Sequence, residues 1–119
     1  MADPRDIVEA FAKQRGLKPE QVGDALRLWH SEAPLFIEVR SGSQGLIVRL
    51  GYEGLRDYVR EVVDTSENPR EEIEDLVDEM STLAYTLAEE LRRSGYKVSL
   101  ETRSAAMDVL GELEEAEEE

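Results

Sequence analysis

The clearest element of this chain is a β-hairpin predicted over residues 35–52, which read LFIEVRSGSQGLIVRLGY. Apolar residues recur at every second position on both sides of a glycine-rich turn, which is typical of two strands with one buried face. That face is formed by Leu35, Ile37 and Val39 before the turn and by Leu46, Val48, Leu50 and Tyr52 after it. We expect Val39 to lie opposite Leu46, with the turn over 41–45, because this register keeps the apolar residues on one side.

Two short helices joined by a tight turn are predicted before the hairpin. Asp3 is placed to cap the first helix, Pro4 stands at its first position, and Gly16 ends it. A second helix is expected over residues 18–29, because four apolar residues recur there at helical spacing. These residues are Val22, Ala25, Leu26 and Trp29. Together the two helices are predicted to form an αα-hairpin.

Helices also dominate the sequence after the hairpin. A third helix is expected from near Glu53, and the longest one over 69–93, with Asn68 as its cap and Pro69 at its first position. The long helix carries apolar residues at alternating spacings of three and four, as in a heptad repeat. A strand over 96–101 and a last helix from about Ser104 complete the chain.

These elements follow one another in the order ααββααβα, which predicts an α+β fold. We expect a three-stranded, antiparallel-dominated sheet with helices packed on one face. A crossover through the two middle helices would place the last strand beside the first, giving the sheet order 2-1-3. Residues 1–114 are predicted to form a single domain, and 115–119 an acidic disordered tail.

The charge of the chain is uneven along its length. The net charge is −14, and residues 60–119 carry 19 acidic and six basic residues, against nine and eight in residues 1–59. There is no cysteine, which excludes a disulfide framework, a thiolate metal site and a cysteine nucleophile. No apolar run is long enough to span a membrane and no secretory signal is recognisable, so we expect a cytoplasmic protein without a membrane partner.

The sequence offers little for catalysis by a nucleophile and a base. His30 is the single histidine and stands near the end of a predicted helix, where the expected role is that of a helix-dipole partner or a rim residue rather than a general base. The segment 41–45 is glycine-rich but lacks the lysine of a phosphate-binding loop. No catalytic residue and no cofactor are therefore assigned.

Four carboxylates on the long helix are candidate metal ligands: Glu71, Asp75, Asp78 and Glu79. Their spacing places them on one helix face, and oxygen ligands of this kind suit Mg²⁺ or Mn²⁺. The spacing resembles the acidic helices of the all-α nucleotide pyrophosphatases of the MazG type, which implies a divalent-metal-dependent hydrolase using residues 71–79. That family needs a second acidic helix facing the first, whereas Glu89 and Glu90 lie on the same helix. A solvated acidic face is the other interpretation.

The N-terminal part carries a second resemblance. Ala12, Gly16 and Val22 stand at a spacing that resembles the helix–turn–helix, and the hairpin after it would be the wing of a winged helix. The resemblance covers residues 4–52 and implies a nucleic-acid-binding regulator. Its candidate contacts are Lys18, Arg27, Arg40 and Arg49. The predicted recognition helix exposes a net negative face, whereas phosphate neutralisation needs Lys and Arg.

The function we expect first is a small, non-enzymatic protein-interaction or regulatory module. The helix over 69–93 is apolar on more than one side and must be covered on more than one side, which favours a homodimer through this helix. The residues expected at that interface are Leu76, Leu83, Tyr85 and Leu87. The acidic half would meet solvent or a basic protein partner.

Overall fold

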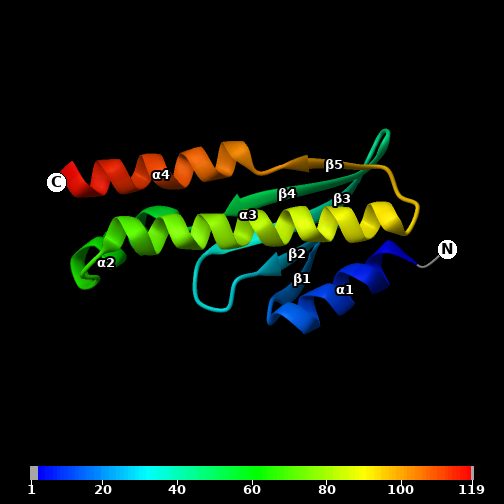
Figure 1. Cartoon of the computed structure of the whole chain (residues 1–119), viewed down its shortest axis with the longest axis horizontal. Helices are drawn as coiled ribbons and strands as arrows, with labels where there is room; N and C mark the ends of the chain where they lie inside the picture. The colour runs from blue at the N-terminus through cyan, green and yellow to red at the C-terminus, as the bar shows by residue number, and fades with distance from the viewer. Residues whose placement is uncertain (1–2, 119) are drawn as a thin grey trace.

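A five-stranded sheet lies at the centre of the computed structural model, which describes residues 3–118 (Figure 1). The helix α1 (Pro4–Arg15) precedes four strands, β1 (Lys18–Val22), β2 (Ala25–Trp29), β3 (Leu35–Gly42) and β4 (Gly45–Tyr52). The chain continues with α2 (Leu55–Thr65), α3 (Pro69–Arg93), β5 (Val98–Glu101) and α4 (Arg103–Glu118). The fold is α+β, as predicted, but the element order differs.

The prediction of a helix over residues 18–29 is wrong, because this segment forms β1 and β2, which pair as a β-hairpin. Its two-residue turn consists of Gly23 and Asp24, and Gly23 has φ 60°, a left-handed conformation that glycine adopts without steric cost. Leu26 and Leu28 are buried, and the residues between and beside them face the other side of the sheet. The helical spacing of the apolar residues in this segment is therefore a coincidence. The period that matches the structure is the alternation of buried and less buried residues along β2.

The prediction of a three-stranded sheet with the order 2-1-3 is also wrong. The strands lie in the order β1-β2-β3-β4-β5, with the first four antiparallel and β5 parallel to β4. A strand offers only two edges for pairing, and β2 occupies the edge of β3 that the prediction gave to the last strand. The last strand therefore pairs with the free edge of β4.

The hairpin predicted over 35–52 is present, with its register shifted by two residues. Val39 pairs with Val48 rather than with Leu46, and the turn is the two-residue segment 43–44 rather than 41–45. A shift of two leaves every side chain on its predicted face, so the apolar pattern alone could not distinguish the two registers.

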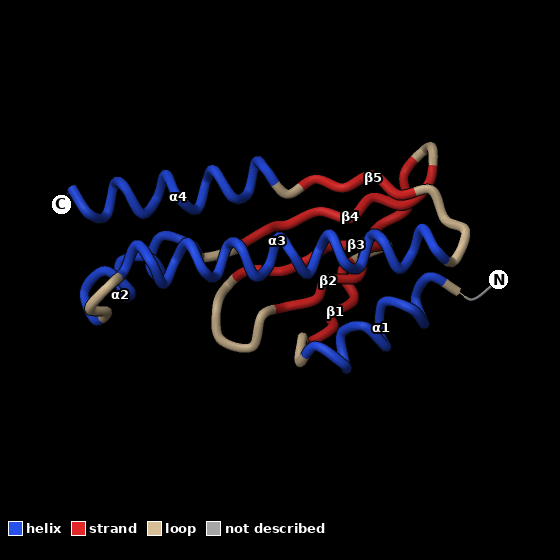
Figure 2. The backbone as a smooth tube through the Cα atoms, in the orientation of Figure 1, coloured by secondary structure: helices blue, strands red, loops and turns tan. Residues whose placement is uncertain are grey.

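The helices α1 and α3 lie against the same face of the sheet (Figure 2). Between this face and the two helices lies the hydrophobic core. Its fully buried members include Val8 and Phe11 of α1, Met80 and Leu87 of α3, and Leu28, Ile37 and Val48 of the sheet. The sheet face opposite to α1 and α3 is named the open face.

The helix α2, the first half of α3 and α4 pack together beyond the end of the sheet (Figure 1). This helical extension makes the molecule elongated, with dimensions of 50 × 25 × 24 Å. Arg70 Nη2 donates to Glu117 Oε1 at 2.7 Å and joins α3 to α4. Residues 115–118, expected to be a disordered tail, are helical, and Glu119 lies outside the described residues.

The helix ends follow local sequence signals closely. Asp3 Oδ1 accepts a hydrogen bond from the backbone N–H of Arg5 at 2.8 Å, and Gly16 ends α1 with φ 70°. The long helix has the predicted bounds, with Pro69 at its first turn, although the Asn68 side chain makes no capping hydrogen bond. No described helix is both long enough and apolar enough to cross a membrane.

Candidate functional site

A row of alternating charges crosses the open face, with one residue from each strand. From β1 to β5 the cross-strand neighbours are Glu20, Arg27, Glu38, Arg49 and Glu101. We name this row the charge ladder. Opposite charges on directly paired strand positions stabilise a sheet, and the alternation keeps like charges from becoming neighbours across all five strands.

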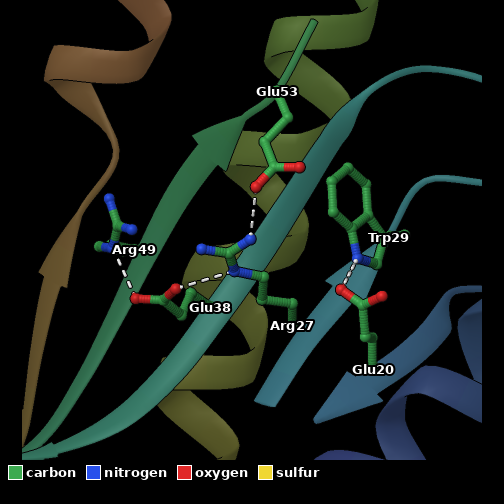
Figure 3. A network of polar contacts seen from close by, with 6 residues as sticks. All are labelled: Glu20, Arg27, Trp29, Glu38, Arg49 and Glu53. Carbon is green, nitrogen blue, oxygen red and sulfur yellow. Dashed lines mark hydrogen bonds and ion pairs between the residues drawn. The ribbon is translucent and has the colours of Figure 1, made fainter. Parts of the chain in front are cut away.

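The centre of the charge ladder is the carboxylate of Glu38, which is held by two guanidinium groups (Figure 3). Glu38 Oε2 accepts from Arg27 Nε at 3.1 Å, and Oε1 accepts from Arg49 Nε at 2.8 Å. Arg27 Nη1 also donates to Glu53 at 2.8 Å. The Glu38 side chain is only 6% exposed, although neither α1 nor α3 lies on this side of the sheet. Side chains of the open face itself thus bury this charge.

The two arginines decide the protonation state of Glu38. Burial alone would raise the pKa of this carboxyl, but the hydrogen bonds from Arg49 and Arg27 and their positive charges outweigh burial and hold the pKa below its usual value. Burial acts against the charge of Arg27 as well, yet its bonds to Glu38 and Glu53 raise the pKa of the guanidinium. Glu38 is therefore a fixed anion at neutral pH and is unsuited to donating a proton.

Aromatic side chains pack beside the charge ladder. The rings of Trp29 and Phe36 lie 4.8 Å apart between centroids, and the Arg27 guanidinium lies 4.3 Å above the Phe36 ring. Trp29 Nε1 donates to Glu20 at 3.1 Å, which ties the aromatic pair to the ladder (Figure 3). The Phe36 ring covers Gly51 so closely that a Cβ there would lie 2.5 Å from ring carbons.

A hollow of about 350 Å³ opens at the rim of this face, where β4 continues beyond its pairing with β5. Phe36, Arg49 and Gly51 line it from the sheet, and Asp108 lines it from α4. The Tyr52 hydroxyl donates to Asp108 Oδ2 at 2.7 Å, and this bond, helped by burial, raises the pKa of the phenol. The hollow combines an aromatic ring, a guanidinium and bare backbone, which suits a large side chain with a polar edge.

The four basic residues predicted to contact nucleic acid all lie on the open face, but not as the resemblance implied. Residues 18–29 form strands, so the described residues contain no helix–turn–helix. Arg27 and Arg49 are both bound to Glu38, while Lys18 and Arg40 are exposed. The acidic members of the charge ladder offset these positive charges.

The four carboxylates predicted as metal ligands do not come together in a site. Glu71, Asp75, Asp78 and Glu79 are exposed along α3. Within residues 3–118, no group of three or more His, Cys, Asp or Glu side chains is arranged as metal ligands would be.

His30 is part of the loop between β2 and β3. Its Nδ1 accepts the backbone N–H groups of Glu32 at 3.0 Å and Ala33 at 2.9 Å. Its Nε2 lies 3.9 Å from Oε1 of Glu79. Because no helix ends at His30, the expected role at a helix dipole is wrong, and the imidazole caps a loop instead.

The residues predicted as a dimer interface on α3 fall mostly inside the fold. Leu76 and Leu87 are buried in the core, and Leu83 is partly buried against it. Tyr85 is 55% exposed. The apolar sides of α3 are therefore covered by the sheet and by the other helices of the same chain.

Sequence reasoning named Arg27 and Arg49 but missed their shared partner Glu38 and the aromatic pair. The signal for the pair was the position of Trp29 and Phe36 on the polar side of alternating strands, where they interrupt the alternation of apolar and polar residues. Comparisons of the chain with protein-family models, curated proteins and solved structures gave no match.

Proposed function

We propose that this protein is a non-enzymatic interaction module, and that the open face of its sheet is the docking surface for a protein partner. The observation that carries the proposal is a charge ladder whose central carboxylate, Glu38, is held by two arginines beside a packed Trp29–Phe36 pair, on the sheet face away from α1 and α3. Aromatic residues and arginine are the residue types enriched at the centres of protein interfaces.

The charge of the open face favours a protein partner over nucleic acid. The face carries four basic side chains, but the ladder places three acidic ones among them, and Glu53 adds another at the rim. Phosphate binding requires positive charges that are free to neutralise the backbone. Arg27 and Arg49 are already bound to Glu38 in this protein.

The chemistry of the polar groups supports binding rather than catalysis. Glu38 is held as an anion by two guanidinium groups, and the Nδ1 atom of His30 already accepts two backbone N–H groups. Neither group is poised to exchange a proton with a substrate. The preorganised side chains instead present a surface that loses little conformational freedom on binding.

Site-specific photo-crosslinking tests the proposal. A benzoylphenylalanine in place of Ile47, on the open face next to the charge ladder, is expected to give discrete protein crosslinks in the native host. The matched control carries the same group at Tyr85, which is exposed on α3. Crosslinks from position 85 but not from 47 would contradict the open face and favour the long helix. Products at 47 that disappear after nuclease treatment would contradict a protein partner.

A further inference from the structure

We infer that the partner at the open face is a second copy of this chain, related by a two-fold axis that runs parallel to the strands between β3 and β4. This inference rests on the proposed function, because it names the occupant of the same surface. Two copies would face each other as packed sheets, which lie roughly 10 Å apart.

The charge ladder restricts the axis to a position between two strands. A rotation about an axis parallel to the strands does not move residues along the strands. Each row of cross-strand neighbours in one copy therefore faces the same row in the other copy, with the strands in reverse order. If the axis passed through β3, Glu38 would face Glu38 of the second copy, and Arg27 would face Arg49, so that like charges would meet. Moving the axis by half a strand spacing, to between β3 and β4, places Glu38 opposite Arg49 and Arg27 opposite Glu101.

Every facing pair of the ladder then has opposite signs. An alternating row is complementary to itself when the axis lies between two strands, which satisfies the self-complementarity that a two-fold interface requires. An axis between β2 and β3 would also pair opposite charges, with Arg27 opposite Glu38 and Glu20 opposite Arg49. Like charges placed opposite each other at an interface repel strongly, so the ladder excludes an axis that runs along β3.

The aromatic row distinguishes the axis between β3 and β4 from the one between β2 and β3, which would leave the hollow beside Gly51 opposite no strand of the second copy. The displacement places Phe36 opposite Gly51 of the second copy, a flat contact because each Phe36 ring is 2% exposed and already covers the Gly51 of its own chain. The same displacement places Trp29 of one copy opposite the position just beyond the end of β5 in the other copy. The hollow of about 350 Å³ in that copy lies there, beside its Gly51. An indole that enters a hollow next to an arginine is typical of the residues that dominate interface energetics.

The overall charge supports contact through this face. Each copy carries a net charge of −14, and most acidic residues lie in residues 60–119. The open face has nearly balanced charges, so two copies meet there with the least repulsion. The two helical extensions would project toward the same end of the dimer, and screening of their repulsion by salt is expected to strengthen the association.

Analytical ultracentrifugation over a range of protein concentrations tests the inference. We expect a monomer–dimer equilibrium that shifts toward dimer between about 0.15 M and about 1 M salt, as the Debye length shortens. Glu101→Arg is expected to weaken the dimer by about tenfold or more, because its side chain would face Arg27 of the second copy. Glu114→Arg, an exposed position on α4, changes the net charge equally and serves as the matched control.

Cysteine crosslinking gives a second measurement that does not depend on affinity. The chain has no cysteine, so each introduced thiol is unique. In the displaced dimer Arg40 faces Ile47 of the second copy, and a mixture of Arg40→Cys and Ile47→Cys is expected to react with a bismaleimide spanning roughly 10 Å. Tyr85→Cys is expected to give no such product.

The possible outcomes distinguish a failure of the dimer inference from a failure of the proposed docking surface. A protein that sediments as a monomer at every concentration and salt would overturn the inference, while a heterologous photo-crosslink at position 47 would still uphold the proposed function. A dimer that crosslinks through Tyr85→Cys and withstands Glu101→Arg would overturn both.

Discussion

Replacing Glu38 with Gln measures what the charge ladder contributes to the fold. The substitution keeps the size of the side chain and removes its negative charge. The amide has one acceptor oxygen and one N–H₂ donor, so one of the two arginines would face a donor instead of an acceptor. Because the Glu38 side chain is 6% exposed, water has little access to repair the lost bond.

The expected magnitude follows from the two bonds and their exposure. A hydrogen bond to a charged group contributes about 1.5–3 kcal/mol, and removing one partner of a fully buried ion pair costs about 3–5 kcal/mol. Arg27 keeps Glu53 as a partner, and the Arg49 side chain is 36% exposed, so both guanidinium groups retain some solvation. We expect Glu38→Gln to lower the free energy of unfolding by about 2–3 kcal/mol, and Tm by roughly 10 °C.

The loss should depend on pH in a defined direction. The pKa of Glu38 in the folded protein lies below its value in the unfolded chain, which is near 4.5. The ionised carboxylate therefore contributes its full stability above this pH, and the contribution is lost as the pH falls through the lower folded pKa. Because Gln does not titrate, the difference between the wild-type protein and the variant should be largest at neutral pH and should shrink in acid.

Urea unfolding followed by the fluorescence of Trp29, the single tryptophan, measures both effects. Glu53→Gln is the matched control, because it removes a bond to Arg27 from a side chain that is 63% exposed. The control should cost less than about 0.5 kcal/mol. Equal losses in the two variants, or a loss for Glu38→Gln that persists unchanged in acid, would refute the assignment of stability to the buried carboxylate.

Three further substitutions test individual contacts by the same unfolding measurement. Gly51→Ala should destabilise by about 1–3 kcal/mol, because the new Cβ would displace the Phe36 ring; an unchanged midpoint would show that the ring moves freely. His30→Ala leaves two backbone N–H groups without their acceptor and should cost about 1–2 kcal/mol, whereas Glu79→Gln should be close to neutral if the loop cap is what matters. Asp3→Ala should cost about 1 kcal/mol, and Asp3→Asn much less, because Asn also caps a helix.

The fold was predictable where the signals are local. The bounds of α3 follow from Pro69 and the residues around it, and the start of α1 follows from Asp3 and Pro4. Residues 18–29 satisfy a helical and an alternating period at once, so no local rule separates the two. Pairing with β3 and cover from α1 make the strand the stable choice.

The candidate site was hidden by a shift of two residues. In the predicted register Glu38 would lie opposite Ile47, whereas in the structure it lies opposite Arg49. Its other partner, Arg27, belonged to a predicted helix and had no reason to be near it. Without these two contacts Glu38 looked like an ordinary surface carboxylate, and the charge ladder could not be recognised.

The sequence by itself determined which side of β3 and β4 each residue occupies, where the long helix begins and ends, and how unevenly charge is distributed along the chain. These properties depend on side-chain periodicity, on capping residues and on composition, all of which act within a few residues. Only the tertiary structure decided that residues 18–29 are strands, which strands are neighbours and in which register they pair. Those choices depend on which sheet edges are free and which faces the helices cover, and they are what aligned five charges from five strands into one ladder.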